Sequence, residues 1–293
     1  MKIERIIDAD EFLSEIQSLV LANPEDMNLI ALIAASKVNG NHFWLVRNPD
    51  NSVESCALVS ERGCVLSPNM RPQAAEAIGE KVGQALNEII PEARGTEETL
   101  PAFLKGYLSH KPNFKAKHHM GVMLYSLQMD QLPSTCNEVA GRFIEGYATP
   151  ATIHDKDILL SFMKQFTADA NVMSTPEQIN TSVENHLNRQ SLFVWKVNDQ
   201  IVASAGHSQP LDIGTHTLYR IVAVFTKATA RCKGYASALT TALCHHLRSK
   251  TNNCRIVLFA DTSNPASNKA YQRIGFVQHK LMMSASFEPD IKS

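Results

Sequence analysis

The sequence predicts an α/β protein made of two lobes that repeat one order of elements. Each half of the chain shows helices, a β-hairpin, a further strand, a long helix and another strand. Between the halves, residues 131–137 are polar and have neither helical nor strand periodicity, which is typical of a domain boundary. The 293 residues are enough for two domains of ordinary size, so we expect a duplicated fold.

Composition indicates a globular protein with free thiols. Hydrophobic residues make up 44% of the chain and charged residues 19%, with a net charge of −1, so no global field selects nucleic acid or an anionic membrane. No apolar run approaches the roughly 20 residues that span a bilayer. The N-terminus carries charges where a signal peptide is apolar, and the six cysteines form no Cys-x-x-Cys pair. We therefore expect a cytoplasmic protein with reduced cysteines.

The first half begins with helices and continues into strands. Apolar residues recur at helical spacing over residues 9–20, and a second helix follows the break at Asn23-Pro24. The other elements expected here are strands over 42–46, 53–60 and 63–66, a long helix over 71–90, a helix over 100–109 and a strand over 119–129.

The second half repeats this order. The elements expected are a strand over 142–149, helices over 156–168 and 176–189, strands over 192–197 and 201–208, and a strand over 216–226. The last of these is apolar on both faces, so it should be covered on both sides. We set the first lobe at residues 1–132, a linker at 133–141 and the second lobe at 142–293.

The residues that indicate chemistry lie between positions 220 and 276. The central strand ends at Thr226, and residues 231–234 lead through a glycine into an Ala/Leu-rich helix. Backbone N–H groups without intrahelical partners lie at the start of such a helix, and the helix dipole favours an anion there. Gly234 permits either close approach of a phosphate or a positive φ. The pattern therefore predicts a pyrophosphate site or, alternatively, a tight turn into a core helix.

A short helix near the C-terminus places two polar side chains on one face. Asn264 is the expected N-cap, with Pro265 at the first helical position and Gly275 as the C-terminal cap. Asn268 and Tyr271 are three residues apart and face the same way. The Tyr271 hydroxyl is either a proton donor to a leaving thiolate or part of a packing side chain.

These segments together resemble the cofactor-binding core of the GNAT superfamily of N-acetyltransferases. The resemblance is carried by the order strand, Arg-x-x-Gly-x-Ala, helix, strand and Asn-Pro-x-Ser-Asn-x-x-Tyr-x-x-x-Gly-Phe. The whole chain resembles two-lobed bacterial members whose first lobe has lost its cofactor motif; residues 67–73 stand there instead. The resemblance implies two GNAT-like acyl-CoA N-acyltransferase lobes, each with a mixed, largely antiparallel sheet flanked by helices.

The resemblance also implies a reaction and its cofactor. Acetyl-CoA would donate an acetyl group directly to a primary amine of a small molecule or peptide, without a metal or a covalent enzyme intermediate. Backbone N–H groups of residues 231–237 would hold the pyrophosphate, the edge of 224–226 would pair with the pantetheine arm, and the first lobe would be non-catalytic. The implied cofactor-binding residues are Val224, Phe225, Thr226, Arg231, Cys232, Lys233, Gly234, Tyr235, Ala236, Ser237, Asn264 and Asn268, and the implied catalytic acid is Tyr271.

Two features depart from the family pattern. Residues 227–230 replace the Pro-Pro-Glu-Tyr common in close relatives, and Cys232 replaces a glycine, which adds a side chain where a phosphate would approach. We disfavour Cys232 as a nucleophile because no partner histidine is identified. The sequence also does not identify the general base. Glu145, His207 and His216 are candidates, and the alternatives are a water chain or an acceptor amine that arrives neutral.

Three other functions stay open on sequence grounds. A degenerate lobe would bind and sense acyl-CoA without turnover. A two-lobed aminoacyl transferase would take its acyl group from aminoacyl-tRNA, although the intact turn at 231–234 and the lack of a basic nucleic-acid face disfavour it. A purely structural protein would not be stabilised by CoA. The sequence identifies neither the acceptor amine nor the oligomeric state.

Overall fold

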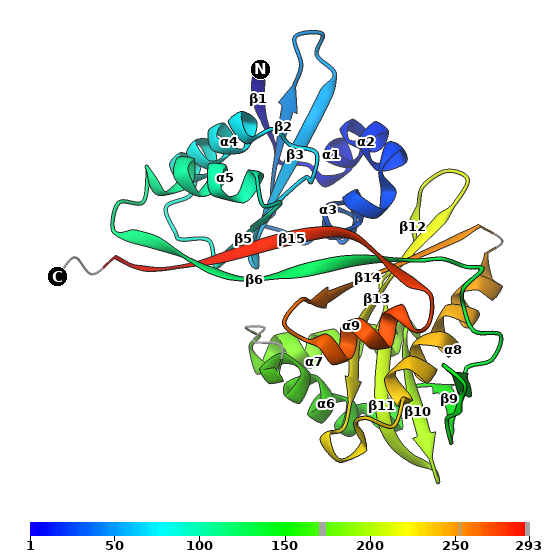
Figure 1. Cartoon of the computed structure of the whole chain (residues 1–293). Helices are drawn as coiled ribbons and strands as arrows, with labels where there is room; N and C mark the ends of the chain where they lie inside the picture. The colour runs from blue at the N-terminus through cyan, green and yellow to red at the C-terminus, as the bar shows by residue number, and fades with distance from the viewer. Residues whose placement is uncertain (170–173, 252, 291–293) are drawn as a thin grey trace. The chain divides into compact units, whose positions relative to one another are not determined.

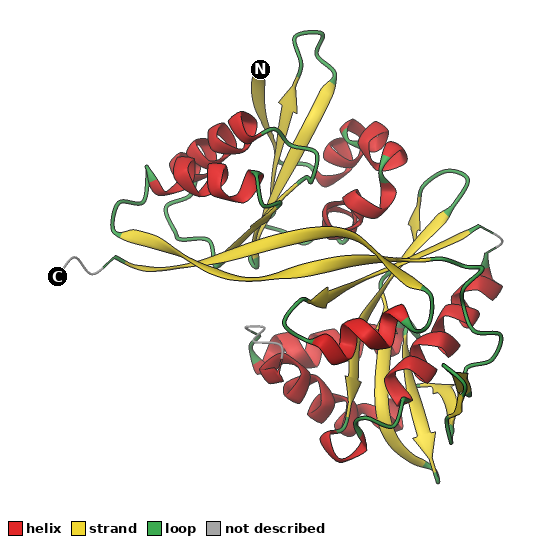
Figure 2. Cartoon of the chain, viewed as in Figure 1, coloured by secondary structure: helices red, strands yellow, loops and turns green. Residues whose placement is uncertain are grey.

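The structure, a computed structural model that describes residues 1–169, 174–251 and 253–290, divides into two compact units. The first contains Met1–Met123 and Lys280–Ser293, and the second contains Leu124–His279. Each combines β-strands with flanking helices (Figures 1 and 2). The two-lobed α/β architecture predicted from the sequence is confirmed.

The unit boundaries differ from those placed at 132 and 142. Two strands of 14 residues, β6 (Phe114–Leu127) and β15 (Phe276–Pro289), contribute residues to both units. The first unit therefore ends before residue 132 and includes the last part of the chain, which the sequence analysis assigned to the second lobe.

The first unit is a largely antiparallel sheet with helices inserted after its first strand and after its fourth. Strands β1 to β4 pair antiparallel in chain order, β4 and β5 pair parallel, and β15 lies antiparallel beside β5. The elements are β1 (Lys2–Ile6), α1 (Ala9–Glu15), α2 (Gln17–Ala22), α3 (Pro24–Ala35), β2 (His42–Arg47), β3 (Val53–Ser60), β4 (Gly63–Leu66), α4 (Pro72–Ala85), β5 (Glu92–Gly95) and α5 (Thr99–Leu108).

The second unit repeats this order. Strands β9, β10, β11 and β13 pair antiparallel, and β13 and β14 pair parallel as β4 and β5 do. The elements are β7 (Glu138–Val139), β8 (Arg142–Phe143), β9 (Tyr147–Pro150), η1 (Ile153–Asp155), α6 (Lys156–Asp169), α7 (Pro176–Asn188), β10 (Leu192–Val197), β11 (Gln200–His207), β12 (Leu211–Asp212), β13 (Thr217–Thr226), η2 (Ala228–Ala230), α8 (Tyr235–Lys250), β14 (Cys254–Asp261) and α9 (Pro265–Gln272).

The central strand β13 is covered by helices, as its apolar faces predicted. Both α6 and α8 pack on it, and Figure 1 shows α6 and α7 on one side of these strands and α8 on the other. The ring centroids of Phe162 on α6 and Phe225 on β13 are 5.0 Å apart. Strand β13 therefore lies in the core of the second unit. Its residues 222–224 are nevertheless part-exposed.

Three expected elements are shorter than the sequence pattern indicated. The first helix is interrupted at Ile16, and the long helix of the first unit ends at Ala85 because Leu86 is extended. The strand expected over 142–149 is broken at Gly146, whose φ is +110°. Hydrophobic periodicity continued through these positions, so it did not reveal the breaks.

Two further properties concern the chain as a whole. Among the described residues, no helix is long and apolar enough to cross a bilayer. All six cysteines are free thiols in the structure.

Candidate active site

The parallel strands β13 and β14 pair over only part of their length. Their pairing ends with Ile221 beside Leu258, although β13 continues to Thr226 and β14 to Asp261. The other edge of β13 pairs with β11 up to Thr226. One edge of β13 is therefore open over residues 222–226 and is able to pair with an extended ligand.

A β-bulge lies where the two strands separate. Ala223 has a φ of +51°, and the register between β11 and β13 shifts between Ser204 and Gly206. A bulge bends its strand and increases its twist, which turns the end of β13 away from β14. Val222, Ala223 and Val224 are part-exposed although they lie on a central strand.

The turn from β13 into α8 contains two residues in the left-handed region. Gly234, the N-cap of α8, has a φ of +89°, and Cys232 has a φ of +63°. Gly234 has no side chain that could cap the first N–H groups of α8, whereas Asn264 Oδ1 caps α9 by accepting from the Ser267 N–H at 3.1 Å. An uncapped helix N-terminus stabilises an anion through its N–H groups and its dipole.

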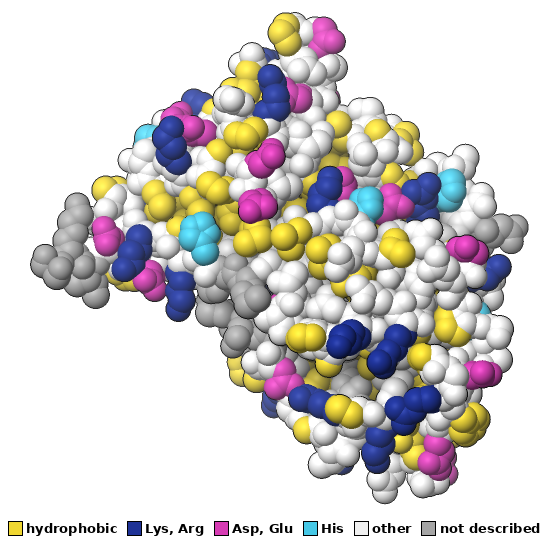
Figure 3. Space-filling view, in the orientation of Figure 1, with side chains coloured by type: hydrophobic (Ala, Val, Ile, Leu, Met, Phe, Trp, Pro, Cys, Tyr) yellow, Lys and Arg dark blue, Asp and Glu magenta, His cyan; other side chains and the backbone are white. Residues whose placement is uncertain are grey.

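Exposed cations gather around this turn. Figure 3 shows Lys and Arg side chains over this part of the second unit. Arg231 is also paired within the protein: its guanidinium donates to Asp169 Oδ2 at 2.6 Å and to the Thr226 carbonyl at 3.1 Å. Arg231 therefore fixes the turn against β13 and α6, as well as supplying the charge predicted from the sequence. The exposed cations of the turn and of α9 are Lys227, Arg231, Lys233, Lys269 and Arg273.

Tyr271 lies on α9 in a largely apolar setting. It is 8% exposed, and its ring centroid lies 6.4 Å from that of Tyr125 and 6.1 Å from that of Phe276. Burial raises the pKa of the Tyr271 hydroxyl, which is therefore neutral and protonated at physiological pH. The Ser237 hydroxyl donates to the Ala270 carbonyl at 3.3 Å, so the first turn of α8 is bonded to the helix that carries Tyr271.

Asn268 fixes α9 to the end of β14. Its Oδ1 accepts from the Tyr125 hydroxyl at 2.7 Å, and its Nδ2 donates at 2.7 Å to the carbonyls of Asp261 and Asn264. Asn264 and Asn268 thus already have partners within the protein, and their expected place beside a pantetheine arm stays a prediction. Tyr125 was not identified from the sequence, because nothing local indicates that β6 ends in the second unit.

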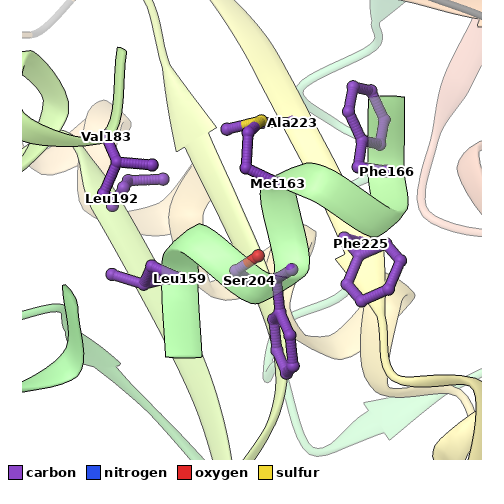
Figure 4. A pocket seen from close by; sticks show the side chains of 9 residues that line it. Leu159, Met163, Phe166, Val183, Leu192, Ser204, Ala223 and Phe225 are labelled. Carbon is purple, nitrogen blue, oxygen red and sulfur yellow. The ribbon is translucent and has the colours of Figure 1, made fainter. Parts of the chain in front are cut away.

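A hollow lies against the bulge on the α6 and α7 side of β13 (Figure 4). Its enclosed space is about 10 Å³, enough for about one water molecule. Figure 4 shows side chains of α6 and α7 around it, with Ser204 and Phe225 contributed by the strands. The lining residues are Leu159, Phe162, Met163, Phe166, Val183, Leu192, Ser204, Ala223 and Phe225.

The segment that contains this site matches a model of a known protein family. Residues 157–276, which include the open strand edge, the turn and both Asn264 and Tyr271, match the model described as the acetyltransferase (GNAT) family. These residues form a GNAT acetyltransferase domain. No curated protein matches the chain.

Solved structures show that the fold extends over the whole chain. A GNAT-family acetyltransferase from Colwellia psychrerythraea is 14% identical, with a TM-score of 0.58, 98% of this chain covered and 100% of that one. A GCN5-related N-acetyltransferase from Sphaerobacter thermophilus is 13% identical, with a TM-score of 0.58 and coverage of 98% and 95%. A tandem GNAT protein from the clavulanic acid biosynthesis pathway is 10% identical, with a TM-score of 0.55 and full coverage of both chains.

The GNAT domain brings most of the predicted site residues together. Residues 224–226 form the open end of β13, and residues 231–237 form the turn and the first turn of α8. Within that first turn Tyr235 and Ser237 are buried and Ala236 is part-exposed. The bulge at Ala223 was not predicted, because alanine has no preference for a positive φ and the apolar pattern of the strand continues through it.

The three candidate bases lie elsewhere in the GNAT domain or just before it. Glu145 is exposed in the segment before β9, and His216 lies 2.8 Å from the Thr215 hydroxyl. His207 is buried on β11, where Nδ1 lies 2.7 Å from the Ser208 carbonyl and burial lowers the imidazole pKa. None of these three residues lines the hollow beside the bulge. The structure therefore assigns no general base.

Proposed function

We propose that the GNAT domain is an acetyl-CoA-dependent N-acetyltransferase that moves an acetyl group directly to a primary amine. The observation that carries this proposal is that an open strand edge and a helix N-terminus, which can bind the two parts of CoA, are consecutive in the chain. Residues 227–233 join the edge of β13 left open over residues 222–226 to the N-terminus of α8, whose N-cap is Gly234.

The residues present fit CoA. The open strand edge offers the alternating N–H and C=O groups that an extended, amide-containing pantetheine arm needs. Gly234 and the first N–H groups of α8 suit a pyrophosphate, and the exposed cations Lys227, Lys233, Lys269 and Arg273 complement its charge. Cys232 is exposed and lies in the same turn.

The chain's own groups then have distinct tasks. Bound acetyl-CoA supplies the acetyl group as a thioester. Tyr271 Oη donates its proton to the leaving thiolate, and the raised pKa of this hydroxyl keeps the proton in place until then. The acceptor amine gives its proton to water or arrives already neutral, since the structure assigns no general base.

We propose that the first unit does not bind CoA. Its β4 strand has only four residues, and α4 begins with Pro72 after an extended Arg71 in place of a left-handed glycine. The Arg71 guanidinium is bonded to the Glu54 carboxylate at 2.6 Å, so this cation is already paired. The counterpart of the cofactor turn thus lacks the left-handed backbone conformation. Its one cation is Arg71, whereas the turn of the second unit carries Lys227 and Lys233 in addition to Arg231.

The direct test is turnover of the purified full chain with acetyl-CoA and a panel of amines. We expect thiol release that depends on the amine and matches the acetylated product measured by mass spectrometry. Stabilisation by CoA without thiol release from any amine would instead identify an acyl-CoA sensor. Transfer only from aminoacyl-tRNA would identify an aminoacyl transferase, and the absence of any effect of CoA would exclude the proposal.

A further inference from the structure

We infer that Tyr125, near the end of β6, is a positioning residue for the proton donor Tyr271, and that it acts by holding α9 through Asn268. The inference rests on the proposed function, because it concerns the acid of the same reaction. Tyr125 lies outside residues 157–276, so neither the family match nor the motif in the sequence includes it. The working site therefore uses a residue that precedes the GNAT domain.

Helix α9 has little apolar packing of its own to fix its position. It has eight residues, about two turns, and a helix of that length is not stable in isolation. Among its residues, all of which the structure describes, only Tyr271 is buried. Hydrogen bonds to neighbouring elements therefore decide where α9 lies and where it places the Tyr271 hydroxyl.

Asn268 bonds α9 to its surroundings. Its Nδ2 donates at 2.7 Å to the carbonyl of Asp261, at the end of β14, and to that of Asn264. An amide donates only from its nitrogen, so these two bonds require Oδ1 to face the other way. The Tyr125 hydroxyl donates to that Oδ1 at 2.7 Å. Tyr125 therefore fixes the orientation in which Asn268 bonds α9 to the end of β14.

The surroundings of Tyr125 favour this bond. Its side chain is fully buried, and a hydrogen bond in such a setting is stronger than one in water. Its ring centroid lies 6.4 Å from that of Tyr271, with 54° between the ring planes, a favourable geometry for an aromatic pair. Tyr125 thus acts on Tyr271 by its ring and, through Asn268, by its hydroxyl.

The chain that follows Tyr125 also borders the residues after α9. The Gln128 N–H donates to the Gly275 carbonyl at 2.9 Å. A Cβ at Gly275 would lie 3.0 Å from the backbone of Gln131, so the two segments pack closely there. Residues 125–131 therefore hold α9 at its middle, through Asn268, and just beyond its C-terminal end.

Removing the Tyr125 hydroxyl should slow proton transfer and leave cofactor binding unchanged. Asn268 is part-exposed, so water can take the place of the lost donor, but the amide loses its fixed orientation. A misplacement of about 1 Å costs up to about 10²-fold in rate, and Tyr271 as a whole should contribute about 10²-fold or more. We therefore expect Tyr125→Phe, which keeps the ring, to lose about tenfold.

The experiment is a double-mutant cycle on the full chain. Thiol release from acetyl-CoA in a single turnover is measured for the wild type, Tyr125→Phe, Tyr271→Phe and the double variant, with the amine of the panel that the wild type uses best. Tyr125→Phe should lose about tenfold alone and about twofold or less in the Tyr271→Phe background, because the position of an absent hydroxyl has no effect. The Kd for CoA should stay at the wild-type value.

A second measurement and a control separate positioning from general stability. Hydrogen–deuterium exchange over residues 265–275 should be faster in Tyr125→Phe, because α9 is held less firmly. Tyr107→Phe is the matched control: Tyr107 is a fully buried tyrosine of the first unit whose hydroxyl accepts from the Ile90 N–H at 3.0 Å. This variant should lower the melting temperature and leave both the rate and the exchange over residues 265–275 unchanged.

The other outcomes separate the inference from the proposed function. A wild-type rate in Tyr125→Phe, or an equal loss in both backgrounds, overturns the inference and leaves acetyl transfer standing. A loss of rate that Tyr107→Phe shares would assign the effect to stability, which also overturns it. If Tyr271→Phe is as fast as the wild type, there is no acid to position and the inference fails. A wild type without amine-dependent thiol release contradicts the proposed function and this inference with it.

Discussion

At the scale of single residues, Tyr271 meets two requirements of a proton donor. Its hydroxyl belongs to a buried side chain whose pKa is raised by that burial, so the proton is retained at neutral pH. Its helix is held by Asn268, whose amide and carbonyl groups join Tyr125, Asp261 and Asn264. The position of the hydroxyl is thus fixed by hydrogen bonds that do not use it.

Removing the Tyr271 hydroxyl should affect turnover and leave binding unchanged. We expect Tyr271→Phe to lower kcat by about 10²-fold or more, because proton transfer of this kind typically contributes 10² to 10⁴. The Kd for CoA, measured by titration calorimetry, should stay at the wild-type value. Tyr147→Phe is the matched control, since it removes a hydroxyl from an exposed tyrosine on β9. Equal turnover of Tyr271→Phe and the control would reassign Tyr271 to packing.

Cys232 lies in the left-handed region of backbone conformation, which favours glycine. The family pattern that the sequence resembles has glycine at this position, and the φ of Cys232 is +63°. A residue with a Cβ in this region costs about 1–2 kcal/mol relative to its usual conformation. The departure noted in the sequence therefore places a strained residue in the turn.

His186 makes stability depend on pH. Burial, with the charge of Arg189 next in size, lowers the pKa of His186 from 6.5 to about 4, and Nδ1 lies 2.7 Å from the Ser191 hydroxyl. The unfolded chain takes up a proton below pH 6.5 while the folded one does not until about pH 4. The free energy of unfolding should therefore fall by up to roughly 3 kcal/mol as the pH drops from 6.5 to 4, and His186 should contribute no change above 6.5.

Urea unfolding at a series of pH values checks this prediction. His186→Gln should flatten the fall between pH 6.5 and 4. His216→Gln, the same change at a part-exposed histidine of the same unit, should keep it. If both variants show the wild-type slope, another group is responsible for it.

At the scale of elements, the site depends on how β13 ends. The bulge at Ala223 separates β13 from β14, and the left-handed Gly234 then starts α8 without a side-chain cap. The motif predicted the turn, the helix and the cap of α9 correctly, because glycine and asparagine have strong positional preferences. The bulge and the hollow depend on pairing between distant strands, and no local pattern encodes them.

Gly234→Val should disrupt both the turn and the cofactor site. A Cβ at Gly234 would lie 2.6 Å from Ile144 Cδ1, the movable end of a side chain, and valine is strained at a φ of +89°. We expect a loss of about 1–2 kcal/mol in the free energy of unfolding and no measurable binding of CoA by calorimetry.

The structure offers a matched control for this change. Gly141 also has a positive φ, +72°, and a Cβ there would meet no atom within 4 Å. Gly141→Val should therefore show similar strain with normal CoA affinity. Wild-type affinity in Gly234→Val would remove the pyrophosphate from this turn.

At the scale of the whole molecule, the two units repeat one fold but do not divide the chain at one point. Residues 280–293 belong to the first unit, where Met283 to Ser286 pair with β5. The repeated order of elements was predicted from the sequence. The placement of the last strand was not, because apolar alternation identifies a strand but not its partner.

A charge on the last strand should therefore unfold the first unit. Ala285 is fully buried in the core formed by β2 to β5 with α4 and α5, so Ala285→Asp should cost more than about 3 kcal/mol there. Leu281→Asp is the control, because Leu281 lies on the same strand and is 37% exposed.

Each unit holds one tryptophan, Trp44 in the first and Trp195 in the second, so ¹⁹F NMR of 5-fluorotryptophan-labelled protein reports on them separately. The Trp44 signal should lose its folded position in Ala285→Asp at lower urea than in the control. A wild-type Trp44 midpoint in Ala285→Asp would return residues 280–293 to the second unit.

The central claim is that the second unit binds CoA along β13 and the turn into α8, and that the first unit does not. Hydrogen–deuterium exchange of the full chain with and without CoA tests it most directly. We predict slower exchange in peptides that cover residues 222–238 and unchanged exchange over residues 63–75, the corresponding strand and helix start of the first unit. Protection over residues 63–75, or none over 222–238, would contradict the account.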